Sequence, residues 1–90
     1  MARLLRKNGT DEPEVLELSL GVNHFGRSPE NHFAINHPTV SSRHCDLTLT
    51  ADGVLVHDHG STNGTFINGQ PIEQAVLLAG QILRLGDVEL

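Results

Sequence analysis

The chain has 90 residues, enough for one domain with a single hydrophobic core and too few for two. Eleven acidic against six basic residues give a formal net charge of −5, which argues against the broad basic face that nucleic-acid or anionic-membrane binding requires. A single anion held at one local site remains compatible with this charge. The one cysteine, Cys45, excludes an internal disulfide and indicates a reducing, cytoplasmic location. No apolar run is long enough to span a membrane, and no secretory signal is recognisable.

Alternation of apolar and polar residues predicts β-strands along the chain. Leu16, Leu18 and Leu20 alternate with polar residues, so we expect all three to point to one buried face. Polar or turn-forming segments are expected at 8–13, 27–31, 36–39 and 51–53, and residues 40–43 are expected to be irregular. The expected strands are 2–6, 14–20, 22–26, 32–35, 45–50, 54–58 and 65–67.

The stretch after Gly69 allows two interpretations. Its apolar residues fit one face of a helix, whereas Gly80 and Gly86 disfavour a helix. We prefer strands at 76–78 and 81–85 joined at Ala79-Gly80, with a last strand at 88–90. Many short strands with turn signals every eight to twelve residues predict a β-sandwich. The chain ends inside an expected strand, which is compatible with a domain excised from a longer protein.

Residues 58–69 form the most unusual segment of the sequence. They contain three Gly, two Asn, two Thr and one Ser, a composition that disfavours a helix. Asn63-Gly64 and Asn68-Gly69 are turn signals that flank the β-prone residues 65–67. The loop offers hydroxyls, a carboxamide and unhindered backbone N–H groups, which can hold an anion or a peptide backbone. Taken alone, however, such a loop is more often a polar surface turn.

Three segments together are far more specific: Gly26-Arg27-Ser28, the Ser-x-x-His at 41–44, and the run from Gly60 to Gly69. Their order and spacing strongly resemble the forkhead-associated (FHA) domain, and the resemblance extends from strand 14–20 to Gly86-Asp87. It implies one all-β domain over residues 1–90, an eleven-stranded sandwich of two sheets. It also implies that loops at one end bind phosphothreonine in a partner, as a non-catalytic protein-interaction module of signal transduction.

The resemblance assigns roles to individual residues. Arg27 corresponds to the phosphate-binding arginine, whose planar guanidinium can donate two parallel hydrogen bonds to phosphate. Without the resemblance, Arg27 would be read as a solvated surface residue, Ser41 as a turn residue and Asn63 as a left-handed turn residue. The expected phosphate-binding residues are Arg27, Ser41, Ser42 and Thr62; those contacting the peptide backbone are Asn63 and Asn68; and Gly26, His44 and Gly64 are structural.

One position departs from the family pattern. Ser42 stands where many members have Arg or Lys in contact with the phosphate. A neutral hydrogen bond contributes about 1 kcal/mol against about 1.5–3 for a charge-assisted one, so we expect weaker phosphate binding here. Arg43 or a nearby histidine could compensate, although a solvated Arg43 is the simpler interpretation.

Other chemistries receive less support. Ser41 and His44 with Asp46 or Asp58 could suggest a hydrolase, but no nucleophile-elbow motif is present. His57 and His59 lie at strand spacing without a third metal ligand at a usual interval, and the Gly-rich loop lacks the Lys of a P-loop. We therefore expect no enzyme activity, no cofactor and no metal.

The predicted partner is a phosphothreonine-containing protein or peptide, either in the same chain or in another. We expect a monomeric module that binds neither nucleic acid nor membrane. The alternative is an FHA-like domain that binds its partner independently of phosphorylation.

Overall fold

The computed structural model describes residues 2–6 and 14–90, and within them every regular element is a β-strand. The expected polar loop at 8–13 lies outside the described residues. The strands are β1 (Arg3–Arg6), β2 (Glu14–Glu17), β3 (Gly21–Gly26), β4 (Phe33–Ala34), β5 (Cys45–Thr50), β6 (Gly53–Asp58), β7 (Thr65–Ile67), β8 (Gln70–Ile72), β9 (Gln74–Leu77), β10 (Leu83–Leu85) and β11 (Val88–Glu89).

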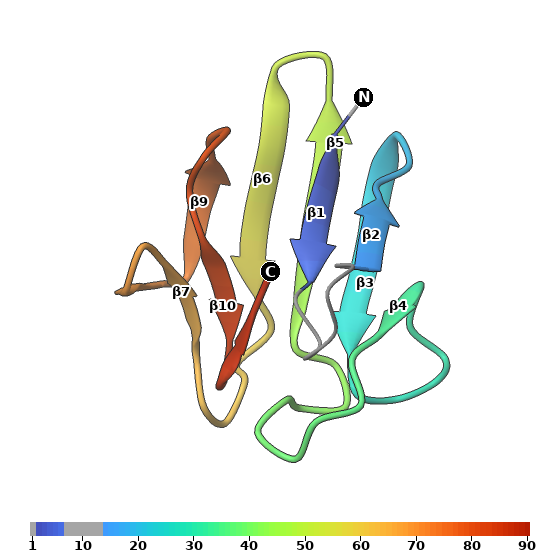
Figure 1. Cartoon of the computed structure of the whole chain (residues 1–90), viewed down its shortest axis with the longest axis vertical. Helices are drawn as coiled ribbons and strands as arrows, with labels where there is room; N and C mark the ends of the chain where they lie inside the picture. The colour runs from blue at the N-terminus through green and yellow to red at the C-terminus, as the bar shows by residue number, and fades with distance from the viewer. Residues whose placement is uncertain (1, 7–13) are drawn as a thin grey trace.

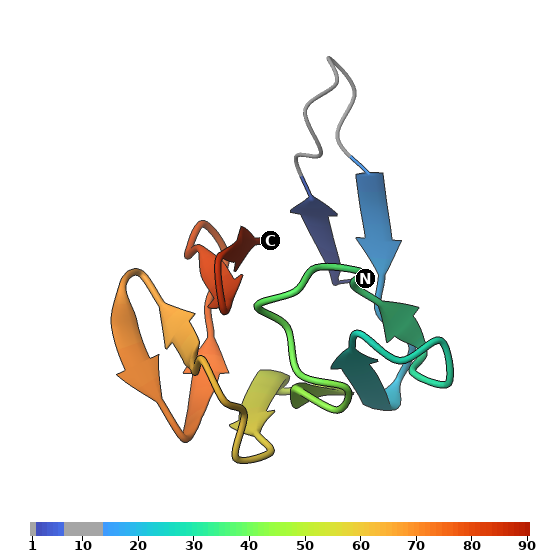
Figure 2. The ribbon, with the colours of Figure 1, turned by 90° about the horizontal axis from the view of Figure 1, so that it is seen from below.

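The strands form a sandwich of short sheets. One sheet has five strands in the order β4-β3-β5-β6-β9, and another has four in the order β11-β10-β7-β8. β1 pairs with β2 in a separate antiparallel ribbon. All pairings are antiparallel except that of β3 with β4. Figure 1 shows the long strands β3, β5 and β6 side by side, and Figure 2 shows, along the strand direction, how the sheets surround the interior.

The core is aliphatic and is supplied by both large sheets. Leu47 of β5 and Val56 of β6 are register partners and are fully buried, as are Leu83 and Leu85 of β10. Phe25 is the one aromatic side chain in the buried cluster. Cys45 lies in the same cluster. Burial raises the pKa of its thiol, with Asp58 and Asp46 adding to the effect, so the thiol stays protonated and packs as a small apolar group.

Two expectations about strands are corrected. β2 ends at Glu17, so Leu16 and Leu18 are buried while Leu20 is 81% exposed. The cause is the tight turn at Ser19–Gly21, in which the side chain of Asn23 bonds to the backbone of Ser19 and Gly21 has a positive φ. After Gly69 the preferred strands are confirmed with shifted bounds, as β9, β10 and β11, and the alternative helix is not found in this described part of the chain. β8 was not among the expected strands.

Several loops gather at one end of the sandwich. β3 and β6 run toward the lower end in Figure 1 and β5 starts there, so the segments after β3 and β6 and the segment before β5 lie at that end. We call the segments 27–31, 39–44 and 58–64 the loop rim. Among the described residues, no helix is long and apolar enough to cross a membrane.

Candidate functional site

The first two segments of the loop rim are joined through their backbones. The N–H of Arg27 donates to the carbonyl of Ser41 at 2.9 Å, and the N–H of Ser28 donates to that of Ser42 at 3.3 Å. Gly26 permits this approach, because a Cβ there would lie 2.2 Å from the carbonyl oxygen of Ser42. Any other residue at position 26 would therefore separate the segment that carries Arg27 from the one that carries Ser41.

Ser41 also connects to the third segment. Its Oγ accepts a hydrogen bond from the backbone N–H of Thr62 at 3.1 Å. The hydroxyl proton of Ser41 has no acceptor among the described residues, so it can be donated to a ligand. The structure therefore brings Arg27, Ser41 and Thr62 to one place. The side chains of Arg27 and Thr62 are exposed there.

His44 is fully buried beneath the loop rim and connects two of its segments. Its Nδ1 accepts the backbone N–H of Ser41 at 3.1 Å, so its proton is on Nε2, which donates to the carbonyl of Gly64 at 2.9 Å. Gly64 itself has a φ of 88°, a left-handed conformation that suits glycine. Because neither ring nitrogen contacts Ser41 Oγ, this arrangement does not activate that hydroxyl as a nucleophile.

Asn63 holds the third segment against the second. Its Nδ2 donates to the carbonyl of Thr39 at 2.8 Å, while its Oδ1 has no partner in the part of the chain described. The hydroxyl of Thr39 in turn accepts the N–H of Asp87, and the N–H of Gly86 donates to the carbonyl of Gly64. Asn63 thus presents a fixed, exposed carboxamide with a free acceptor.

Asp58 organises the loop that follows β6. Its carboxylate accepts the backbone N–H groups of Gly60 and Ser61 and the hydroxyls of Ser61 and Thr65. Partial burial raises the pKa of Asp58, but these hydrogen bonds outweigh that effect and hold the pKa below its ordinary value. Ser61 Oγ also accepts the N–H of Gly64. The loop is consequently preorganised before any ligand arrives.

Asn68 is the one expected site residue that the structure does not bring to the loop rim. It lies at the far end of β7: Thr65 pairs with Leu85 near the rim, whereas Ile67 pairs with Leu83. Its N–H and Oδ1 bond the backbone of Ile82, and its φ of 49° belongs to a hairpin turn with Gly69. Asn68 therefore serves the β7–β8 turn, and its position gives no support to a peptide contact.

Ser42 and Arg43 lie at the outer side of the second segment. The side chain of Ser42 is exposed, and its carbonyl accepts the side-chain Nδ2 of Asn31 at 2.7 Å. Arg43 Nη2 lies 3.3 Å from His24 Nδ1, on the outer face of the β3–β5 pair. The guanidinium of Arg43 thus lies beside His24 and lines a small neighbouring pocket.

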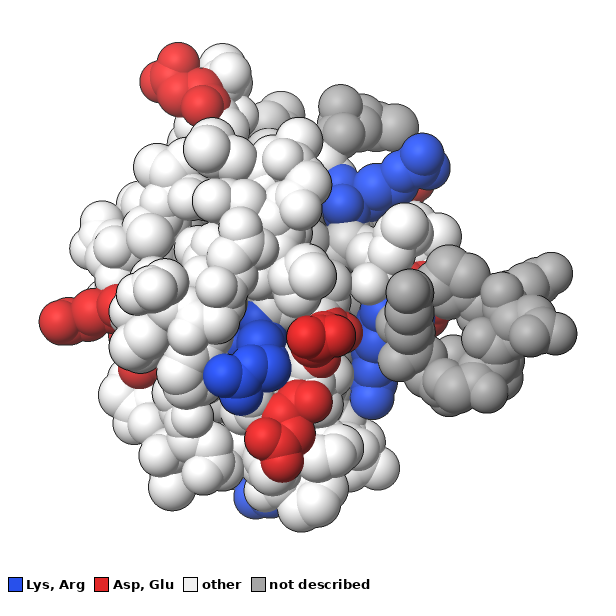
Figure 3. Space-filling model, turned by 60° about the vertical axis from the view of Figure 1, so that its left-hand side comes forward, with Lys and Arg blue, Asp and Glu red and all other residues white. Residues whose placement is uncertain are grey.

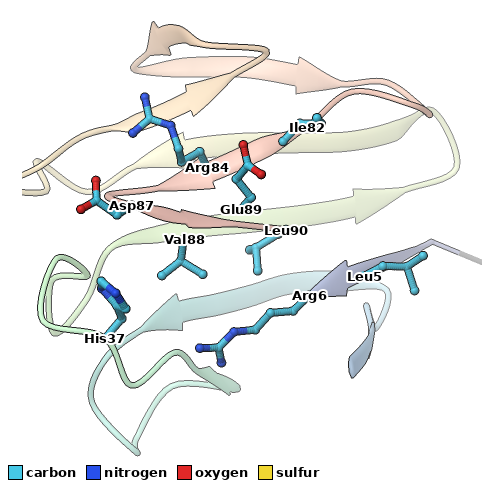
Figure 4. Close-up of a pocket in the computed structure, with 9 residues that line it drawn as sticks. All are labelled: Leu5, Arg6, His37, Ile82, Arg84, Asp87, Val88, Glu89 and Leu90. Atoms are coloured by element: carbon cyan, nitrogen blue, oxygen red, sulfur yellow. The ribbon is translucent and has the colours of Figure 1, made fainter. Parts of the chain in front are cut away.

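The other candidate sites are weaker. One hollow, of about 680 Å³, lies between β1 and β11 and carries mixed charges: Arg6, Arg84, Asp87 and Glu89 (Figure 4). Figure 3 shows a face on which acidic and basic side chains are scattered without a continuous basic patch. Residues 2–6 and 14–90 contain no group of three or more potential ligands arranged to hold a metal ion.

Sequence reasoning did not single out Thr39 or Asn31, and it considered Asp58 only as a possible member of a hydrolase triad, although all three fix the loop rim. Asp58 carries a local signal, since Asp two or three residues before Gly and Ser favours a side-chain-to-backbone turn. Thr39 carries no such signal, because its partners Asn63 and Asp87 lie 24 and 48 residues away.

This geometry agrees with the family suggested by the motifs. The sequence profile of the FHA domain matches residues 23–86, which include all three rim segments. The chain belongs to the FHA-domain family. Domains of this family are phosphopeptide-binding modules, and the chain is accordingly a non-catalytic protein-interaction module.

Relatives and solved structures extend the match to almost the whole chain. The glycogen accumulation regulator GarA of Mycobacterium tuberculosis is 33% identical over 89 residues, covering 99% of this chain and 55% of GarA. The oxoglutarate dehydrogenase inhibitor of Corynebacterium jeikeium is 32% identical over 89 residues, covering 99% of this chain and 62% of that protein. The chain therefore spans little more than half the length of these relatives.

Among solved structures, the FHA domain of FhaA, a Mycobacterium tuberculosis protein, matches with a TM-score of 0.85 and 30% identity. The match covers 94% of this chain and 92% of that one, and FhaA is there complexed with the intracellular domain of Rv3910. A structure described under phosphothreonine-dependent FHA domain interactions matches with a TM-score of 0.86 and 28% identity over 98% of this chain and 92% of that one.

Proposed function

We propose that this FHA domain binds phosphothreonine in a partner protein and that the loop rim is the binding site. The observation that carries the proposal is the bonding of Ser41 to both neighbouring segments, which places Arg27, Ser41 and Thr62 together. The ligand carries about −1.5 to −2 charges at pH 7. Because the domain has a net charge of −5, it can attract this anion only through a local site.

Each group has a distinct role. The guanidinium of Arg27 donates charge-assisted hydrogen bonds to the phosphate, since it is exposed and has no ion-pair partner in the described chain. Ser41 donates its free hydroxyl proton, and Thr62 and Ser42 add neutral donors. The Oδ1 of Asn63 accepts an N–H of the peptide backbone.

Because the guanidinium of Arg43 lies beside His24, we infer that it does not compensate for the neutral side chain of Ser42. We therefore infer that the affinity for the phosphate alone is modest. Burying the extra methyl group of phosphothreonine contributes only about 0.8 kcal/mol, or about fourfold in affinity. A strong preference for phosphothreonine over phosphoserine would thus require the shape of the rim as well as that contact.

The partner can lie in the same polypeptide or in another. We place this binding in the cytoplasm, where the buried thiol of Cys45 would remain reduced. The domain acts as a monomer in this proposal, because one rim contains all the proposed groups.

The test is calorimetry with a phosphothreonine peptide library and its dephosphorylated counterpart. Arg27→Ala should weaken binding by about 100-fold or more, since removing one partner of such a charge pair costs about 2–5 kcal/mol. Its melting temperature should stay close to that of the wild type, because the side chain is exposed. Arg3→Ala, an exposed arginine on β1, is the matched control and should bind normally. Equal affinity for the dephosphorylated peptides would instead support phosphorylation-independent binding.

A further inference from the structure

A small polar pocket lies at the outer side of the loop rim, and its lining includes none of Arg27, Ser41, Thr62 and Asn63. It has a volume of about 140 Å³ and is lined by His24, Glu30, Asn31 and Arg43. At about 30 Å³ per water molecule, this space holds four or five waters, or one carboxylate or phosphate group. The pocket is therefore suited to one small polar group.

The hydrogen-bond pattern leaves Arg43, the cation of this pocket, without an anionic partner. Asp46 Oδ1 lies 2.5 Å from His24 Nδ1, so this nitrogen carries a proton and donates it to the carboxylate. The same nitrogen lies 3.3 Å from Arg43 Nη2 and cannot also accept a hydrogen bond from it. Arg43 forms no ion pair within the described residues. Its donors are consequently available to an anion.

The acidic side chains nearby do not neutralise Arg43. Asp46 is occupied on both oxygens, by His24 and by His59 Nε2 at 2.5 Å. Partial burial raises the pKa of Asp46, but the hydrogen bonds from these histidines outweigh it and hold the pKa below its ordinary value. Glu30 lines the pocket but is exposed and lies outside ion-pair distance of Arg43.

The pocket borders the groups proposed to bind phosphothreonine. Arg43 directly follows Ser42, and Asn31 bonds the carbonyls of both Ser28 and Ser42. Ser41 lies between this side of the rim and the loop that carries Asn63, because it bonds Arg27 through its carbonyl and Thr62 through its hydroxyl. A peptide held by Asn63 would therefore meet the pocket on the other side of its phosphothreonine.

We propose that the pocket of Arg43 and His24 is a second anion subsite, which takes a carboxylate or phosphate group close in sequence to the phosphothreonine of the partner. This inference rests on the proposed function of the loop rim. It makes Arg43 a specificity residue, and it makes Glu30 a residue that weakens the subsite by like-charge repulsion.

The test compares phosphothreonine peptides whose flanking residues are alanine, aspartate at one position, or phosphoserine at one position, scanned over three residues on each side. Wild-type protein should prefer the best acidic peptide over the alanine peptide by about 1.5- to 5-fold at low salt, the range expected for an exposed charge pair. The aspartate and phosphoserine series tell which anion is preferred.

Two variants should move this preference in opposite directions. Arg43→Gln should reduce the ratio of the two affinities to about one, and Glu30→Gln should increase it. Arg3→Gln changes the net charge as Arg43→Gln does, yet should leave the ratio unchanged because Arg3 lies on β1. These three side chains are exposed, so folding should be preserved.

The outcomes separate the two proposals. If no phosphothreonine peptide binds, the proposed function itself fails. If the alanine-flanked peptide binds and no acidic position improves affinity, only the subsite is overturned. A uniform loss for all peptides in Arg43→Gln would also overturn it, because Arg43 would then contact the phosphothreonine.

Discussion

Two Asn-Gly turns, five residues apart at opposite ends of β7, have the same sequence and different roles. Asn68-Gly69 closes the β7–β8 hairpin, and its hydrogen bonds go to the backbone of Ile82. Asn63-Gly64 lies in the loop rim, and its bonds go to Thr39 and His44 of segment 39–44 and to Gly86 after β10. The segments that its bonds join therefore place one of these turns in the proposed binding site, and the dipeptide sequence alone does not distinguish the two.

The largest effect is expected where the rim turn depends on a buried side chain. His44→Ala should destabilise the domain by about 3 kcal/mol, because it leaves a cavity and deprives the N–H of Ser41 and the carbonyl of Gly64 of their partners. Denaturant unfolding measures this change in the free energy of unfolding. The control His57→Ala, at an exposed position, should cost less than about 0.5 kcal/mol. Equal losses in the two variants would contradict the bridging role of His44.

The second largest effect is expected for Asp58, whose carboxylate orders the loop before Asn63. Asp58→Asn should cost about 2 kcal/mol at pH 7, since hydrogen bonds to a charged group are lost. The pKa of Asp58 is lower in the folded than in the unfolded chain, so its contribution is complete above the unfolded pKa of about 3.9 and disappears as the pH falls through the folded pKa.

Stability should therefore fall less steeply below pH 4 in Asp58→Asn than in the wild type, with some slope remaining because Asp46 behaves in the same way. Asp52→Asn, in the exposed β5–β6 hairpin, is the control and should keep the wild-type slope. An unchanged slope in Asp58→Asn would argue against the hydrogen-bonded carboxylate.

The two asparagines themselves give the most direct contrast. Asn63→Ala should weaken phosphopeptide binding by about 10-fold, because both a peptide contact and the bond to Thr39 are lost. Asn68→Ala should leave affinity within about twofold. Comparable losses of affinity in the two would place Asn68 in the site and contradict the structural separation of the turns.

The smallest effect concerns the stability of the hairpin turn. Asn68→Ala should cost about 1 kcal/mol, because alanine tolerates the φ of 49° poorly and cannot bond the N–H of Ile82. Asn68→Gly should recover the part of this loss that comes from the backbone conformation. Thermal unfolding of the wild type, Asn68→Ala and Asn68→Gly measures both the loss and the recovery of stability. An Asn68→Gly variant less stable than Asn68→Ala would contradict this explanation.

Much of the fold follows from local sequence. The alternation in residues 45–50 predicted β5, and Asn68-Gly69 predicted a turn, because both depend on neighbours along the chain. Leu20 was placed wrongly because an apolar residue at the right interval can still fall beyond the end of a strand. β8 was missed because Pro71 and its two neighbours show no alternation, and its pairing with β7 supplies the order.

The site was less accessible to sequence reasoning. The motifs indicated which loops matter, but not that the Asn68 side chain bonds Ile82 or that Arg43 lies beside His24. These facts depend on contacts between segments distant in sequence. The same holds for Thr39, which anchors Asn63 and Asp87.

The central claim is that one rim, and not the opposite end of β7, receives the phosphothreonine. Titration of the isotopically labelled domain with a phosphothreonine peptide, followed by amide NMR, tests it directly. We expect the largest shifts at Arg27, Ser41, Thr62 and Asn63, with Asn68 and Gly69 nearly unchanged. Large shifts at Asn68 and Gly69 together with an unperturbed rim would contradict the proposal.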